Sequence, residues 1–149
     1  MKTTFTEFRK LVASTFWTQQ LVKHYHYQVR GNDFQIVHEL MQEFYEYLDD
    51  KIDLLNERLV QEGYKPVVSL VEIIDLRNNE LNDIDETKIR SNEIYNNLIL
   101  DFEILKKQLN ELISYYVDCG DVNNTTNEDI LREFKAWIEK QIWMIKNSL

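Results

Sequence analysis

Apolar side chains recur every three or four residues through most of the chain, which is the spacing of an amphipathic helix. The pattern stops at the three glycines of the sequence, Gly31, Gly63 and Gly120. It predicts two long helices, at about residues 4–30 and from Phe34 to the break at Gly63. Two more are expected, one from near residue 87 to Gly120 and one that includes residues 130–145. The polar run that ends at Asn127 is expected to be a loop.

A short helix is predicted over residues 70–76, inside the connection between the second and third long helices. The first two long helices and the last two are joined tightly, so each pair is expected to form an antiparallel hairpin. The middle connection is long enough to cross the end of a bundle. The sequence therefore predicts one all-α domain over residues 1–149. Its expected fold is a ferritin-like four-helix bundle with a short extra helix in that connection.

Composition supports this fold class and excludes others. The 149 residues include three Gly and one Pro, where ordinary usage gives roughly 17 of the two together. An all-β domain needs many more turn residues. The lone Cys119 cannot build a disulfide framework, and no apolar run approaches the roughly 20 residues of a membrane span. We therefore expect a cytoplasmic protein with no membrane contact.

Charge indicates which partners the protein prefers. Asp and Glu number 26 against 17 Lys and Arg, which gives a formal net charge of −9. This balance disfavours duplex DNA as an electrostatic partner and favours cations.

Two histidines lie close to the first glycine break. His26 is five residues before Gly31 and His38 is seven residues after it, so an antiparallel hairpin places them at similar height. Asp53 and Glu57 are four residues apart and share a helix face. Because His38 and Asp53 are 15 residues apart, about 22 Å separates them along one helix. They cannot bind the same metal ion within one chain.

The polar positions of this helix form a palindrome about the midpoint between Tyr47 and Leu48. Two antiparallel copies related by a two-fold axis would place His38 opposite Glu57, and residue 42 opposite Asp53. That arrangement gives two equivalent sites at a dimer interface. Mixed imidazole and carboxylate ligands suit Fe(II), with Zn(II) and Mn(II) as competitors. The alternative is a chance pattern in a helix rich in acids.

The same residues resemble a known family. The segment His26-Tyr-Gln-Val-Arg-Gly31-x-x-Phe34-x-x-x-His38-Glu39, followed by Asp53-x-x-x-Glu57-Arg58, resembles the Dps proteins, which are dodecameric mini-ferritins. The Gly63-x-x-Pro66 turn with the short helix after it also resembles this family. The likeness continues at residues 134–138 and 142–144, and so covers nearly the whole chain.

The resemblance implies an activity. Dps proteins bind Fe(II) at sites between subunits, oxidise it preferentially with hydrogen peroxide and store the ferric mineral in a hollow shell, which protects against oxidative damage. This implies a ferroxidase whose substrates are Fe(II) and hydrogen peroxide. His26 and His38 would come from one subunit, and Asp53 and Glu57 from its two-fold mate.

One position departs from the family pattern. Gln42 stands where the family usually has Asp, and an amide oxygen is a weaker ligand than a carboxylate. Weaker iron binding and slower oxidation are expected, unless Glu46, one turn further on, compensates. The second interpretation is therefore a Dps-like shell with a weakened or inactive site, acting in slow metal sequestration or as a structural or DNA-associated protein. The third is a bundle that only makes protein contacts.

Three further expectations concern radical traps, an entry pore for iron, and DNA binding. Tyr27 and Trp143 match aromatic neighbours of the family site and are candidate radical traps, with plain packing as the alternative. The acids Asp121, Glu128 and Asp129 are candidates for a three-fold entry pore, with stabilisation of the last helix as the alternative. Only residues 1–3 precede the first helix, so no basic tail is seen there. DNA binding is expected to be weak or absent.

Overall fold

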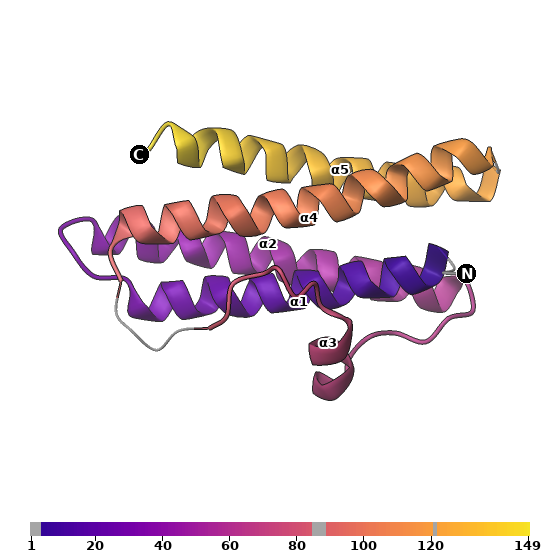
Figure 1. The fold of residues 1–149 in the computed structure, drawn as a ribbon, viewed down its shortest axis with the longest axis horizontal. Helices are drawn as coiled ribbons and strands as arrows, with labels where there is room; N and C mark the ends of the chain where they lie inside the picture. The colour runs from indigo at the N-terminus through magenta and orange to yellow at the C-terminus, as the bar shows by residue number, and fades with distance from the viewer. Residues whose placement is uncertain (1–3, 85–88, 121) are drawn as a thin grey trace.

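The computed structural model describes residues 4–84, 89–120 and 122–149, which form the five helices of Figure 1. They are α1 (Thr4–Gln28), α2 (Phe34–Gln61), α3 (Leu70–Leu76), α4 (Ser91–Cys119) and α5 (Val122–Lys146). The all-α prediction is confirmed, and so is the short helix in the second connection. Within the described ranges, no helix is both long enough and apolar enough to cross a membrane.

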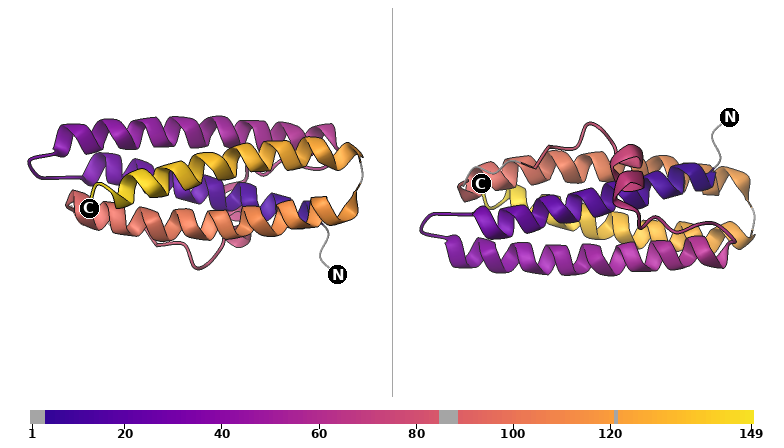
Figure 2. Two further views of the ribbon diagram at one scale, coloured as in Figure 1. Left: turned by 90° about the horizontal axis from the view of Figure 1, so that it is seen from above. Right: turned by 90° about the horizontal axis from the view of Figure 1, so that it is seen from below.

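The long helices pack as two hairpins. α1 lies along α2, and α4 lies along α5. Figure 2 shows the two hairpins side by side, with the α1–α2 turn and the α4–α5 turn at opposite ends of the molecule. The small helix α3 lies outside the bundle against α1. The connection that carries it brings the chain back to the start of α4, as expected for one long crossover.

Aromatic side chains join α2 to the second hairpin. The ring of Phe44 meets those of Phe102 and Trp137 edge-on, at centroid distances of 5.8 and 5.5 Å. Tyr47 stacks on Trp137 at 3.9 Å. Such ring pairs add stabilisation beyond the area they bury. This packing fixes the rotation of α2, and therefore decides which face of α2 points away from the bundle.

Two predicted helix boundaries were wrong. α4 begins at Ser91 rather than near residue 87. Just before it, Ile89 bridges Val29, because the N–H of Arg30 donates to the Ile89 carbonyl at 3.0 Å. The same bridge ends α1 at Gln28. Residue 87 itself lies outside the described residues.

The predicted loop up to Asn127 was also wrong, because α5 already begins at Val122. Asn127 is fully buried, and its side-chain oxygen accepts a hydrogen bond from Nε of Arg58 at 2.5 Å. This part-buried, charge-assisted bond stabilises Asn127 in its helical position, against the modest helix propensity of Asn.

The crossover connection is attached to the bundle at Asn82. Its backbone N–H and its side-chain amide both donate to Oδ1 of the fully buried Asp101, at 3.0 and 3.1 Å. Its carbonyl accepts from Trp17 Nε1 at 2.9 Å. Burial raises the pKa of Asp101 to about 6 from its ordinary 3.8, and the bonds from Asn82 offset only part of this rise.

This raised pKa predicts greater stability in mild acid. The folded state holds the Asp101 proton more tightly than the unfolded state, so its contribution is complete below pH 4 and is lost as the pH rises through 6. By linkage the difference amounts to about 3 kcal/mol. Urea unfolding at pH 5 and pH 7.5 should show about half of this difference, about 1.4 kcal/mol, because at pH 5 the unfolded state has already lost the proton and the folded state is one pH unit below its pKa. Asp101→Asn should remove this part of the pH dependence; an unchanged pH profile in the variant would contradict the assignment.

Candidate metal centre

The two histidines beside the first turn are in direct contact. His26 near the end of α1 and His38 in the second turn of α2 stack with ring centroids 3.6 Å apart and an angle of 17° between their planes. Nδ1 of His26 lies 2.7 Å from the carbonyl oxygen of His38. Nδ1 of His38 lies 2.7 Å from the carbonyl oxygen of His26. The expectation that the hairpin brings them to the same height is met.

These reciprocal hydrogen bonds decide the tautomer of both rings. A carbonyl oxygen only accepts, so each Nδ1 must carry the proton and donate it. In the neutral ring, Nε2 then keeps its lone pair, which is the form that binds a metal ion. The second ring nitrogen of a metal-binding histidine is usually held in this way. The two hydrogen bonds thus orient two Nε2 atoms that can act as metal donors.

An aromatic shell surrounds the pair. Phe34 stacks on His38 at 5.1 Å, and Tyr27 and Tyr45 meet His26 edge-on at 5.1 and 5.3 Å. The sequence interpretation missed Tyr45, although it follows His38 by seven residues, two helical turns on the same face. Burial raises the pKa of Tyr45, and Glu46 and Tyr27 add to this effect. Tyr45 therefore holds its phenol proton more tightly than a free tyrosine does.

The candidate carboxylates lie far from the histidines of their own chain. Asp53 and Glu57 are exposed on α2, about 22 and 28 Å beyond His38 along the helix. Among the described residues, no three or more His, Cys, Asp or Glu side chains gather closely enough to hold a metal ion. The two histidines and the two carboxylates are therefore separate groups in one chain, and the shared site between two chains stays a prediction.

Gln42, the departure from the family pattern, is exposed and already bonded. Its amide nitrogen donates to Oε1 of Glu46 at 3.0 Å. This contact places the Glu46 carboxylate directly beside the position where the family has Asp. It also turns the amide nitrogen of Gln42 toward Glu46. The amide oxygen is then the one atom of Gln42 that could bind a metal ion, and it is a weaker ligand than a carboxylate oxygen.

The other candidate residues are not joined to this centre. Trp143 is 65% exposed in α5, and no ring contact between it and the histidine pair is seen in the described part of the chain. Glu128 pairs with Arg132 at 3.1 Å, while Asp129 is exposed and Asp121 lies outside the described residues. The pore therefore stays a prediction.

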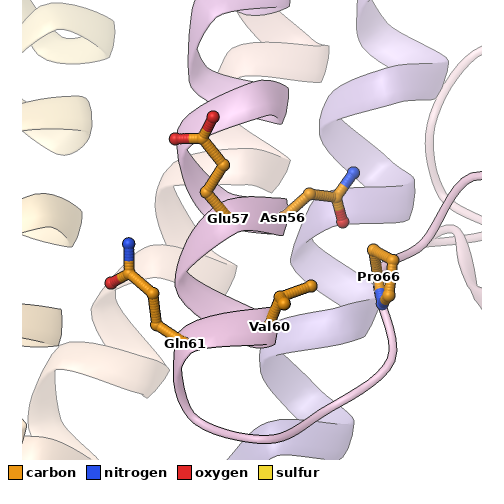
Figure 3. A pocket seen from close by; sticks show the side chains of 5 residues that line it. All are labelled: Asn56, Glu57, Val60, Gln61 and Pro66. Carbon is orange, nitrogen blue, oxygen red and sulfur yellow. The ribbon is translucent and has the colours of Figure 1, made fainter.

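Glu57 lies at the edge of a pocket of about 430 Å³ near the far end of α2. Figure 3 shows its lining side chains, which are Asn56, Glu57, Val60, Gln61 and Pro66. Asn56 holds the returning loop in place, since it accepts from the N–H of Val67 at 2.8 Å and donates to its carbonyl at 3.1 Å. These two bonds hold the wall of the pocket in place beside Glu57, the candidate metal ligand.

Comparison with known proteins places these features in a family. A family model described as a ferritin-like domain matches residues 7–149. The "DNA protection during starvation protein" of Helicobacter pylori strain J99 is 32% identical over 146 residues, 98% of each chain. The structure of Helicobacter cinaedi CAIP is similar with a TM-score of 0.90 and 25% identity, covering 99% of both chains. Dps from Listeria monocytogenes gives a TM-score of 0.91 at 24% identity, covering 99% of this chain and 93% of that one. The chain therefore belongs to the ferritin-like family and, within it, to the Dps proteins.

Proposed function

We propose that this protein binds Fe(II) at sites shared between two-fold-related subunits, oxidises it and stores ferric iron in a hollow homo-oligomeric shell, a dodecamer. The observation that carries the proposal is the reciprocal bonding of His26 and His38, which leaves both Nε2 atoms as metal donors. Asp53 and Glu57 of the second subunit complete each site. The fold supports the shell, since the similar solved structures include Dps from Listeria monocytogenes.

The proposed oxidant is hydrogen peroxide. Two Fe(II) ions lose one electron each, and the two electrons break the O–O bond of one peroxide molecule. With two water molecules, the products are two FeO(OH) units of ferric mineral and four protons. The carboxylates balance the added positive charge of Fe(III). Consuming Fe(II) and peroxide together removes the reactants that generate hydroxyl radical. Tyr27, whose ring meets that of His26 edge-on, is the proposed donor of an electron to a stray radical.

An anaerobic Fe(II) titration followed by peroxide tests the proposal. Stoichiometric Fe(II) binding and rapid peroxide consumption are expected, by a particle of about twelve times 18.0 kDa. A stable monomer, or Fe(II) binding no higher than that of buffer, contradicts the proposal. Zn(II) and Mn(II) are expected to compete for the same donors.

Protection of DNA is proposed to be indirect. The relative in Helicobacter pylori has DNA protection in its name, but this chain has a formal net charge of −9. Net negative charge opposes contact with phosphates. Removal of iron and peroxide, rather than coating of DNA, fits this charge. A salt-sensitive gel shift at submicromolar protein would contradict this view.

The bond between Gln42 and Glu46 favours a second candidate function, which is slow sequestration of metal without fast oxidation. Gln42→Asp should then raise the rate of Fe(II) oxidation about tenfold, because it adds a carboxylate to a site that must hold Fe(III). Stopped-flow absorbance of ferric species gives the rate. The control is Gln35→Asp, which breaks the equivalent bond from Gln35 to Glu39 on the same helix. Equal rates in both variants would show that Gln42 does not limit the oxidation.

A further inference from the structure

The pocket beside Glu57 has an apolar wall that no side chain of the described chain fills. In Figure 3 the side chain of Val60 points toward the returning loop that carries Pro66. Val60 is 56% exposed. The bonds from Asn56 to Val67 hold this loop, so the wall cannot close by simple collapse. The pocket holds about 430 Å³, enough for an aromatic side chain.

We propose that this pocket receives the side chain of Phe34 from a second copy of the chain. The inference rests on the proposed function, because it uses the two-fold axis at the midpoint between Tyr47 and Leu48 that pairs His38 with Glu57. The same axis pairs Phe34 with Gln61, one turn further out on each helix. Phe34 of the second copy therefore lies over the mouth of the pocket.

Phe34 has the properties that this contact needs. It is the first residue of α2 and 44% exposed, and one face of its ring lies on His38 at 5.1 Å. Its other surface is available for the Val60 and Pro66 wall of the partner. An aromatic side chain that becomes buried removes roughly 150–250 Å² from water. The two-fold axis makes this contact twice in each dimer.

The contact couples assembly to the metal centre. Phe34 is a positioning residue, since its apolar ring cannot bind a metal ion and acts through the ring of His38 on which it stacks. When it is held between His38 and the pocket of the partner subunit, the His38 ring and the partner's Glu57 are fixed relative to one another. The same contact that holds the dimer together then also sets the distance between the histidines of one chain and the carboxylates of the other.

A double-mutant cycle tests the contact. Within one chain Phe34 and Val60 are 26 residues apart on one helix, about 39 Å, so they can couple only through a second copy. Phe34→Ala should raise the dimer dissociation constant about 30-fold, the size of an interface hot spot. Val60→Ala should weaken the dimer less. The double variant should be no weaker than Phe34→Ala alone, because the contact is already lost.

Sedimentation velocity over a concentration series, in conditions where the proposed shell dissociates into dimers and monomers, gives the dimer dissociation constants, and circular dichroism checks that each variant keeps its helices. Phe34→Leu should recover most of the affinity. Ile36→Ala removes an apolar side chain of the same helical turn that is more exposed than Phe34. It should leave the dimer dissociation constant unchanged. An additive cycle, or an unchanged dissociation constant for Phe34→Ala, overturns the inference.

The measurements distinguish a wrong Phe34 contact from wrong iron chemistry. If the wild-type protein binds and oxidises Fe(II) but the cycle is additive, only the Phe34 contact is wrong. If the cycle shows coupling but the wild-type protein binds no Fe(II), the interface stands and the iron chemistry is wrong.

Discussion

Mixing two inactive variants, His38→Ala and Glu57→Gln, is expected to restore about one quarter of the wild-type iron oxidation. Each variant alone damages every site. After the two are unfolded and refolded together, half of the dimers contain one chain of each kind. In such a dimer one site has both defects and the other has neither, because the proposed site takes its histidines from one chain and its carboxylates from the other. About a quarter of all sites are then intact.

The control for this experiment is a second mixture, His26→Ala with His38→Ala. In the proposed site both histidines come from the same chain, where they bond each other, so no combination of these two variants gives an intact site. The initial rate of ferric absorbance after peroxide addition measures both mixtures. No recovery in the first mixture, or equal recovery in both, would rule out the shared site.

Each single histidine variant, tested alone, is also expected to bind Fe(II) more weakly. Loss of the partners that orient a metal ligand typically costs 10–100-fold in affinity, and loss of the ligand itself costs at least as much. His26→Ala and His38→Ala should therefore lower Fe(II) affinity by more than about 100-fold. His24→Ala, on the same helix as His26 but about 200° around it, is the matched control and should bind Fe(II) normally.

The long helices and the position of the histidine pair could be predicted from the sequence. Helical periodicity and three glycines define the long helices, and the count of residues on either side of Gly31 places His26 level with His38. The spacing of His38 and Asp53 shows that one chain cannot complete a site. These inferences depend only on helix geometry, which is nearly independent of context.

Other features depend on tertiary contacts that no local pattern records. The reciprocal bonds from each Nδ1 to the opposite carbonyl require the exact offset of α1 against α2. Asn127 in the second turn of α5 is bonded by Arg58, 69 residues before it in the chain. The bridge from Val29 to Ile89 shortens two helices at once. Such long-range contacts override local propensity.

Gly31→Ala is expected to separate the two histidines. The φ angle of Gly31 is +128°, and a Cβ there would lie 3.2 Å from Nη1 of Arg90 and 3.4 Å from Oδ1 of Asp33. Strain of this kind costs about 1–3 kcal/mol. The far end of the Arg90 side chain can move away from the added Cβ, but the strain of the positive φ stays in the backbone. We expect the turn to relieve it by moving the end of α1 against the start of α2, which lengthens the reciprocal hydrogen bonds.

Because those bonds fix the direction of both Nε2 atoms, the same substitution should lower Fe(II) affinity about 10–100-fold, as expected for loss of an orienting partner. Gly120→Ala is the matched control, since Gly120 also has a positive φ, +61°, but lies between α4 and α5 with no atom within 4 Å of the added Cβ. It should lose stability in urea while keeping its Fe(II) affinity. Equal Fe(II) affinity in the two variants would mean that the helix contacts, and not the turn, hold the histidine pair. Lower affinity in Gly31→Ala alone would show that one backbone conformation, which favours glycine, sets the geometry of the iron donors.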